Sequence, residues 1–116
     1  MAPINATLTT TGRKSGQPRS VPLYAFEDGD NLVIVGSWAG RPVDPAWVGN
    51  LRAEPSATIR VGRRDHRVRA REVRVPSEER DRLWALVTEA FRYYATYQRK
   101  TTRVIPLFVL EPDTQE

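Results

Sequence analysis

The sequence contains no cysteine and a single histidine, His66. Without cysteine, disulfides, thiolate nucleophiles and Cys-ligated zinc or iron–sulfur sites are excluded. One histidine cannot form a histidine-rich metal site, and a Ser–His–Asp triad would have to use it. His66 stands beside Asp65 in a charged turn, so we assign it no role. We therefore expect no metal site and no thiol chemistry.

Long apolar runs are also missing. Leu32–Val35 and Val104–Leu110 are the longest, far below the roughly 20 residues that cross a bilayer as a helix. The N-terminal residues MAPINATLTT do not show the charged and then apolar pattern of a secretory signal. With 116 residues, 40% of them hydrophobic, and a mean hydropathy of −0.52, we expect a single domain (1–116), cytoplasmic and without an integral membrane segment.

Lysine is scarce, although the chain is basic. There are 18 Lys and Arg residues against 14 acidic ones, a net charge of +4 and a pI near 10.0. Only Lys14 and Lys100 are lysine, and arginine favours bidentate contacts with phosphate and carboxylate groups. An anionic partner is expected, and the composition does not choose among nucleic acid, anionic lipid and an acidic small molecule.

The hydrophobic pattern predicts a mainly β protein of the α+β class. Asp44 and Pro45 are typical of a helix start, and Ser77 is a good N-cap for a longer helix. Residues 93–100 fit either a further helical turn or a loop. The chain is expected to form a small barrel of about six antiparallel strands with flanking helices. The expected elements are strands 4–11, 19–26, 31–37, 56–62, 66–75 and 103–110, and helices at 46–53 and after Ser77.

Two of the expected strands depart from simple alternation. Pro22 favours an edge strand or an interrupted strand for residues 19–26. In residues 66–75, Val68 and Ala70 share one face, whereas Val73 lies on the other. This change indicates either a β-bulge near residues 71–72 or a strand that passes between two packing environments.

Residues 9–16, TTTGRKSG, have the composition of an anion-binding loop. Two glycines allow the backbone to turn its N–H groups inward, and hydroxyls and two cations surround them. The loop is not a Walker A motif, because Lys14 precedes Gly16 and the spacing of that motif is absent. A solvated hairpin turn with incidental charge is the open alternative.

Three further segments are candidates for binding. Gly36–Gly40 ends a strand with small residues, which suits a flat ligand or an ordinary turn. Trp47 and Asn50 share one side of the short helix, where they could meet a ligand, join the core or cap the helix. The tyrosines at 93, 94 and 97 could stack on a substrate and donate a proton, or pack on the barrel.

Seven arginines between Arg60 and Arg74 form the densest positive region. Such a face could meet phosphates. We favour a solvated strand face, because Asp65 and Glu72 interrupt the run and no aromatic side chains alternate with it as stacking platforms.

In chain order, several motifs resemble the deazaflavin-dependent nitroreductase family, split β-barrel oxidoreductases that use coenzyme F-420. The resemblance extends from Thr7 to Pro112. Departures from the family pattern stand at Trp38, Ala39, Asp44 and Val48. The matching motifs are TTTGRKSGQPR at 9–19, Gly36-Ser37, Pro45–Trp47, Asn50-Leu51, YQRKT at 97–101 and RVIP at 103–106.

The resemblance implies a split barrel that binds a deazaflavin with a phosphate and an oligoglutamate tail. It implies hydride transfer from reduced coenzyme F-420 to an electron-poor acceptor: a quinone, a nitroaromatic or an enone. The resemblance places Tyr94 and Tyr97 on the substrate side. Because the two lie three positions apart, a helical segment would turn both toward one side, and we expect Tyr97 to orient and help protonate the acceptor while Tyr94 packs against it. The implied cofactor-binding residues are Gly12, Arg13, Lys14, Ser15, Gly16 and Arg19 for the tail, Ser37, Trp38, Ala39 and Gly40 for the ring, and Pro45, Trp47 and Asn50 for closing the groove.

Other functions remain open at this point. The chain could be a non-catalytic deazaflavin carrier, which would keep the loop at 12–19 and lack turnover. A basic β-barrel that binds nucleic acid is disfavoured, because no stacking aromatics line an expected strand face. A heme or FMN protein could use the same barrel, although one histidine argues against heme. No nucleic-acid partner is therefore expected, and assembly as a homodimer is left open.

Overall fold

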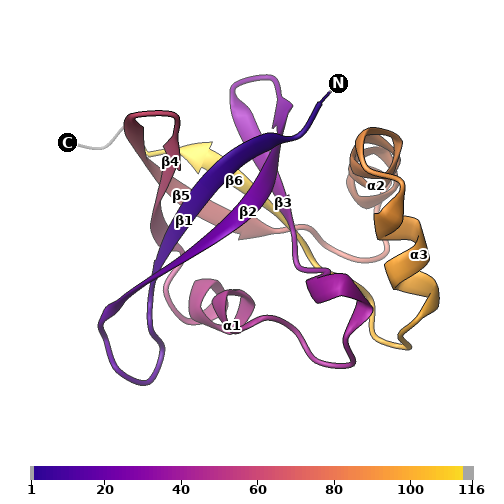
Figure 1. Ribbon diagram of the computed structural model, residues 1–116, viewed down its shortest axis with the longest axis horizontal. Helices are drawn as coiled ribbons and strands as arrows, with labels where there is room; N and C mark the ends of the chain where they lie inside the picture. The colour runs from indigo at the N-terminus through magenta and orange to yellow at the C-terminus, as the bar shows by residue number, and fades with distance from the viewer. Residues whose placement is uncertain (1, 114–116) are drawn as a thin grey trace.

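The computed structural model describes residues 2–113, in which six antiparallel strands form a closed barrel with helices packed outside it (Figure 1). The strand order around the barrel is β1-β2-β3-β6-β5-β4. This confirms the predicted fold class. The elements are β1 (Ile4–Thr11), β2 (Pro18–Asp28), β3 (Asn31–Val35), the short 3-10 helix η1 (Trp38–Gly40), α1 (Ala46–Ala53), β4 (Ser56–Val61), β5 (Arg64–Glu72), α2 (Glu78–Ala90), α3 (Tyr93–Arg99) and β6 (Leu107–Pro112).

The barrel opens along the first half of β2. This strand pairs with β1 from Pro18 to Ala25, but with β3 only from Ala25 to Asp28. Residues 18–24 therefore have one edge that no described strand covers. Pro22, opposite Thr7 on β1, lies in this half, where its missing N–H breaks no pairing with β3. The expected edge is confirmed, and β2 is not interrupted.

Two hydrophobic cores result from the alternation of side chains along the strands. The first core takes residues such as Leu8, Ile34 and Phe108 from all six strands, and Val48 and Leu51 of α1 join it. The second core lies between the barrel and α2 with α3, which stand on one side of it (Figure 1). Because β3 and β6 are buried on both faces, they hold the segments that follow β3 and precede β6 in fixed places. The second core includes Phe26, Val33, Val35, Val73, Leu83, Val87, Tyr94, Ile105, Leu107 and Val109.

The change of face near residue 72 is explained by these two cores. Val68 and Ala70 pack in the first core, and Val73 packs in the second. The register of β5 on β6 runs without a break to Glu72. The strand therefore passes between two environments, and no bulge is present in this pairing.

Helix starts were predicted with mixed success. Ser77 caps α2, since its Oγ accepts a hydrogen bond from the Arg80 backbone N–H at 2.9 Å. The capping role expected for Asp44 is wrong: Pro45 is the N-cap of α1, without a side-chain hydrogen bond. The Asp44 carboxylate instead pairs with Arg52 and Arg103, and a carboxylate held by two guanidiniums is not free to cap.

The C-terminal region contains one helix more than the sequence required. Residues 93–99 form α3, which settles the choice between helix and loop. The last strand begins at Leu107 and not at Arg103, because Arg103 is held by loop atoms upstream. Within residues 2–113, no helix is long and apolar enough to span a membrane.

Candidate active site

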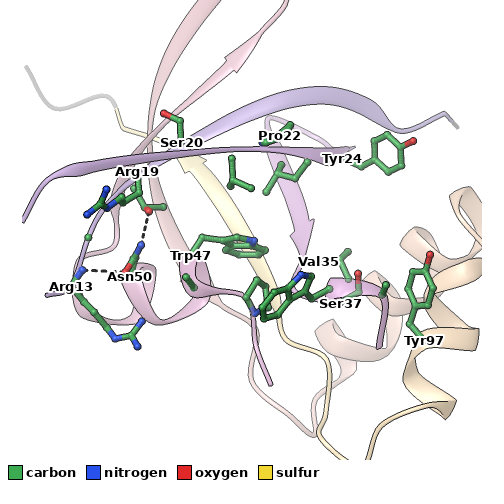
Figure 2. Close-up of a pocket in the computed structure, with 18 of the residues that line it drawn as sticks. Arg13, Arg19, Ser20, Pro22, Tyr24, Val35, Ser37, Trp47, Asn50 and Tyr97 are labelled. Atoms are coloured by element: carbon green, nitrogen blue, oxygen red, sulfur yellow. Dashed lines mark hydrogen bonds between the residues drawn. The ribbon is translucent and has the colours of Figure 1, made fainter. Parts of the chain in front are cut away.

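A cleft of about 820 Å³ runs along the uncovered edge of β2. This volume is ordinary for a small-molecule site. Figure 2 shows Ser20, Pro22 and Tyr24 of β2 on one side and Trp47 and Ser37 on the other. The cleft brings together thirteen of the residues predicted for the site: Gly12, Arg13, Lys14, Ser15, Arg19, Ser37, Trp38, Ala39, Pro45, Trp47, Asn50, Tyr94 and Tyr97.

Two predicted residues, Gly16 and Gly40, do not line this cleft. Gly16 adopts a φ of 71° and borders a smaller hollow of about 270 Å³ that includes Arg67. Gly40 has a φ of 78° and packs against α3, where an added Cβ would come within 2.8 Å of the Tyr97 carbonyl oxygen. Both glycines thus serve backbone geometry where they stand.

The backbone of the loop at 12–17 is largely committed to internal hydrogen bonds. Gly12 N–H donates to the Gln17 carbonyl at 2.8 Å, and Gly16 N–H donates to the Gly12 carbonyl at 2.7 Å. Gln17 N–H donates to Ser15 Oγ at 3.1 Å. The expected ring of inward-facing N–H groups is therefore mostly absent. Anion binding at this loop falls mainly to side chains.

The loop end of the cleft carries three cations without acidic partners. Arg13, Lys14 and Arg19 are exposed, and none of them forms an ion pair with a carboxylate in residues 2–113. By contrast, Arg52, Arg60, Arg71, Arg82 and Arg103 are all ion-paired. This end of the cleft is therefore positively charged and attracts anions.

Helix α1 holds the cationic loop in place. The buried side chain of Asn50 accepts a hydrogen bond from Arg13 N–H and donates one to Thr10 Oγ1, both at 3.1 Å (Figure 2). Its amide oxygen and nitrogen each have a protein partner, so Asn50 positions the loop. Gly49 lies under the Arg13 guanidinium, where an added Cβ would be 2.6 Å from Nη1.

Sequence reasoning placed Thr10 in the loop at 9–16 without foreseeing its contact with Asn50, and it missed Gly49. A glycine inside a short helix is a weak signal for a close approach, because it costs about 1 kcal/mol relative to alanine.

Trp38 and Ala39 form a strained turn in the middle of the cleft. Their φ angles are 40° and 53°, a region that residues other than glycine rarely adopt, at a cost of about 1–3 kcal/mol each. Trp38 is 43% exposed, and the Arg41 guanidinium lies 4.6 Å from the centre of its ring. The turn thus places an aromatic surface at the cleft.

Trp47 belongs to the core and at the same time lines the cleft. It is buried in the first core, packs edge-to-face on Phe108 with centroids 5.8 Å apart, and also lines the cleft. A rigid indole that belongs to the core forms a firm wall for a flat ligand.

The far end of the cleft is aromatic. Phe91 contacts Tyr24, Tyr94 and Tyr97, with ring centroids 5.5, 4.8 and 6.5 Å apart. Burial raises the pKa of the Tyr94 hydroxyl above its ordinary 10.0, and the nearby phenols of Tyr24 and Tyr97 raise it further. Tyr94 therefore stays protonated at neutral pH. Phe91 and Tyr24, which sequence analysis did not assign to the site, complete this end.

Most of the missed cleft residues belong to the uncovered edge of β2. Pro22 was the signal in the sequence for such an edge, but it did not say what the edge would face. The lining residues outside the prediction are Thr10, Ser20, Val21, Pro22, Leu23, Tyr24, Val35, Ala46 and Phe91.

These features define a class of protein: a split β-barrel whose cleft, basic at one end and aromatic at the other, suits a flat ligand with an anionic tail. The sequence matches, over residues 1–112, the family model described as F420H(2)-dependent quinone reductase. The chain belongs to this family, which confirms the resemblance found from its motifs.

Individual relatives agree with the family match. The F420H(2)-dependent quinone reductase Rv1261c of Mycobacterium tuberculosis (strain ATCC 25618 / H37Rv) is 41% identical over 110 residues, covering 94% of this chain and 74% of the relative. A solved F420-H2 dependent reductase (FDR-A) is 40% identical with a TM-score of 0.83, covering 92% and 93% of the two chains. A solved chain described as a domain-swapped dimer is 38% identical with a TM-score of 0.84, covering 96% and 82%.

Proposed function

We propose that this protein is an oxidoreductase that transfers a hydride from reduced coenzyme F-420 to a quinone. The observation that carries the proposal is the difference between the two ends of the cleft, one basic and one aromatic. Three cations that have no acidic partner within residues 2–113 stand at one end, and four aromatic rings stand at the other. Family membership supports both the coenzyme and the acceptor.

The residues present fit the coenzyme. Its phosphate and glutamate carboxylates match the side chains of Arg13, Lys14 and Arg19, since guanidinium and ammonium groups bind such oxygens strongly. Ser37, Trp38, Ala39, Pro45 and Trp47 would hold the ring in the middle of the cleft. When bound, the reduced deazaflavin supplies the hydride.

The chain itself would bind, orient and shield the reactants. The aromatic end, with Phe91, Tyr94 and Tyr97, would hold a flat acceptor and exclude water. Reduction of a quinone to a hydroquinone by a hydride also needs a proton. We infer that the Tyr97 hydroxyl hydrogen-bonds to the acceptor oxygen and supports this protonation, because Tyr97 lines the cleft and its hydroxyl has no hydrogen-bond partner within residues 2–113. Tyr94, held in the core, mainly packs.

Binding and turnover can be tested separately. Titration with oxidised coenzyme F-420, with FMN as the control, is expected to show clear preference for the deazaflavin. Stopped-flow mixing of the reduced coenzyme and protein with menadione is then expected to show oxidation. Equal or tighter FMN binding would contradict the assigned coenzyme, and binding without oxidation by any quinone, nitroaromatic or enone would indicate a carrier.

We propose that the chain assembles as a homodimer, a possibility that the sequence left open; a related solved chain is described as a domain-swapped dimer. Light scattering during size-exclusion chromatography is expected to give twice the chain mass of 13.2 kDa. A mass equal to one chain across the micromolar range would contradict it.

A further inference from the structure

Arg103, in the loop before β6, forms hydrogen bonds with the segment that follows β3. Nη1 donates hydrogen bonds to the Gly36 carbonyl at 3.1 Å and to Asp44 Oδ1 at 2.8 Å. Nη2 donates to the Ser37 carbonyl and Nε to the Arg41 carbonyl, both at 2.8 Å. The side chain is only 15% exposed, and it does not line the cleft.

The segment that Arg103 binds contains a strained turn, which needs a restraint to persist. Trp38 and Ala39 both have positive φ angles, and such strain persists only where the surroundings over-determine the conformation. Within the turn, only Gly40 N–H to the Ser37 carbonyl and Arg41 N–H to the Trp38 carbonyl give support, at 2.8 and 3.1 Å. The carbonyls that Arg103 binds stand directly before and just after the strained pair.

Asp44 extends the same contact to α1. Its carboxylate accepts hydrogen bonds from Arg103 at 2.8 Å and from Arg52 at 3.2 Å. Arg52 is in turn held by Glu72 on β5, with two hydrogen bonds of 2.8 Å. The strained turn is thereby tied to the helix whose Asn50 holds the cationic loop.

We propose that Arg103 is a positioning residue for the middle of the cleft, where it holds Trp38 and Ala39 in the conformation that meets the ligand. This proposal rests on the proposed function. A lysine keeps the charge, but its single ammonium group lacks the planar guanidinium, whose three nitrogens donate to four acceptors here. Arg103→Lys is therefore expected to release the turn while preserving the net charge.

The ligand test separates the ring from the tail. Arg103→Lys is expected to weaken binding of coenzyme F-420 and of its deazaflavin core without the phosphate tail by the same factor, about tenfold, because the binding-competent turn becomes a minor state. The dependence on salt should equal that of the unaltered protein, since the tail cations are untouched.

Arg82→Lys is the matched control. Arg82 also forms a bidentate contact with a carboxylate, that of Asp28, with hydrogen bonds of 2.9 and 3.0 Å. Neither residue lines the cleft. This variant should leave both affinities within about twofold. If Arg103→Lys does not fold, Asp44→Asn removes the negative charge and one of the two oxygens that accept from Arg103 and Arg52. It is expected to give a smaller loss of affinity, about threefold, for both ligands.

A measurement without ligand tests directly whether Arg103 restrains the turn. Hydrogen exchange of the Gly40 and Arg41 amides should become at least about tenfold faster in Arg103→Lys, with no change in Arg82→Lys. Unchanged exchange, or unaltered affinity for the tail-less core, would overturn the proposal. If the unaltered protein binds neither ligand, the proposed function fails instead, a result that is distinct because it does not involve the variants.

Discussion

At the scale of single residues, ion pairs within the chain determine which cations remain available to bind a ligand. Most of the ion-paired arginines lie away from the cleft, on exposed strand and helix faces. Arg13, Lys14 and Arg19 line the cleft and form no ion pair within residues 2–113, so they are available to an anion that enters it. All seven arginines between Arg60 and Arg74 are exposed, as expected of a solvated face, and two of them, Arg60 and Arg71, pair with Asp65 and Glu79.

Replacing both loop cations is expected to weaken coenzyme binding about a hundredfold or more, since each charge-assisted contact is worth roughly 1.5–3 kcal/mol. The variant is Arg13→Ala with Lys14→Ala, and titration at several salt concentrations measures the loss. Affinity for the tail-less deazaflavin core should not change. If coenzyme affinity and its salt dependence stay as they were, the loop is only a turn.

The Tyr97 hydroxyl is expected to matter for turnover and not for coenzyme binding. Proton donation by a positioned side chain is worth about 10²–10⁴-fold, so Tyr97→Phe should slow oxidation of the reduced coenzyme by menadione by a factor in this range. Tyr94→Phe is the control and should have little effect, because the ring and its packing on Phe91 are kept. A Tyr97→Phe rate equal to that of the unaltered protein would assign the proton to water.

At the scale of elements, α1 links the cationic loop to the turn in the middle of the cleft. Its Gly49 and Asn50 set the position of Arg13, and its Arg52 reaches Asp44 and thereby Arg103. A helix of eight residues is too short to be stable alone in water. Its place is set by Trp47, Val48 and Leu51 in the barrel core.

Gly49→Ala is expected to stabilise the fold while weakening tail binding. Alanine favours a helix over glycine by about 1 kcal/mol, and the new Cβ displaces only the flexible end of Arg13. The melting temperature should rise slightly, and coenzyme affinity should fall about tenfold. In an Arg13→Ala background the same change should not alter affinity; an equal loss there would show that Gly49 acts by another route.

At the scale of the whole molecule, ion pairs tie the outer helix to the barrel. Arg82 of α2 pairs with Asp28 of β2, and Glu79 of α2 pairs with Arg71 of β5. The hydrogen bonds from Arg82 and Arg71 lower the pKa of Asp28 and of Glu79 below their ordinary 3.8 and 4.5. Both carboxylates therefore favour the folded state when ionised.

The free energy of unfolding is expected to fall in acid. For a lowered pKa, the stabilisation is complete above the ordinary value and is lost as the pH falls through the lowered one. Because both pairs are partly exposed, each contributes at most about 1 kcal/mol. Urea unfolding of Asp28→Asn with Glu79→Gln should differ from the unaltered protein at pH 7 and converge with it near pH 2. A constant difference at all pH values would contradict this origin.

Local sequence patterns determined much of the architecture. Alternation placed Val21, Leu23 and Ala25 of β2 opposite Phe26, and these faces do meet different cores. Ser77 marked the start of α2, and Pro22 marked an uncovered edge. Such features follow from the sequence because backbone propensity, capping and burial of one face act over a few neighbouring residues.

Only the tertiary structure decided which groups are free to bind and which are already occupied. Asn50 reaches Thr10 across 40 positions, and Arg103 reaches Asp44 and Ser37 across 59 and 66 positions. Asp44 looked like a helix cap because nothing near it in the sequence shows the two arginines that hold it. A polar side chain takes the partner that chain packing brings within about 3 Å, and that choice is made between segments distant along the sequence.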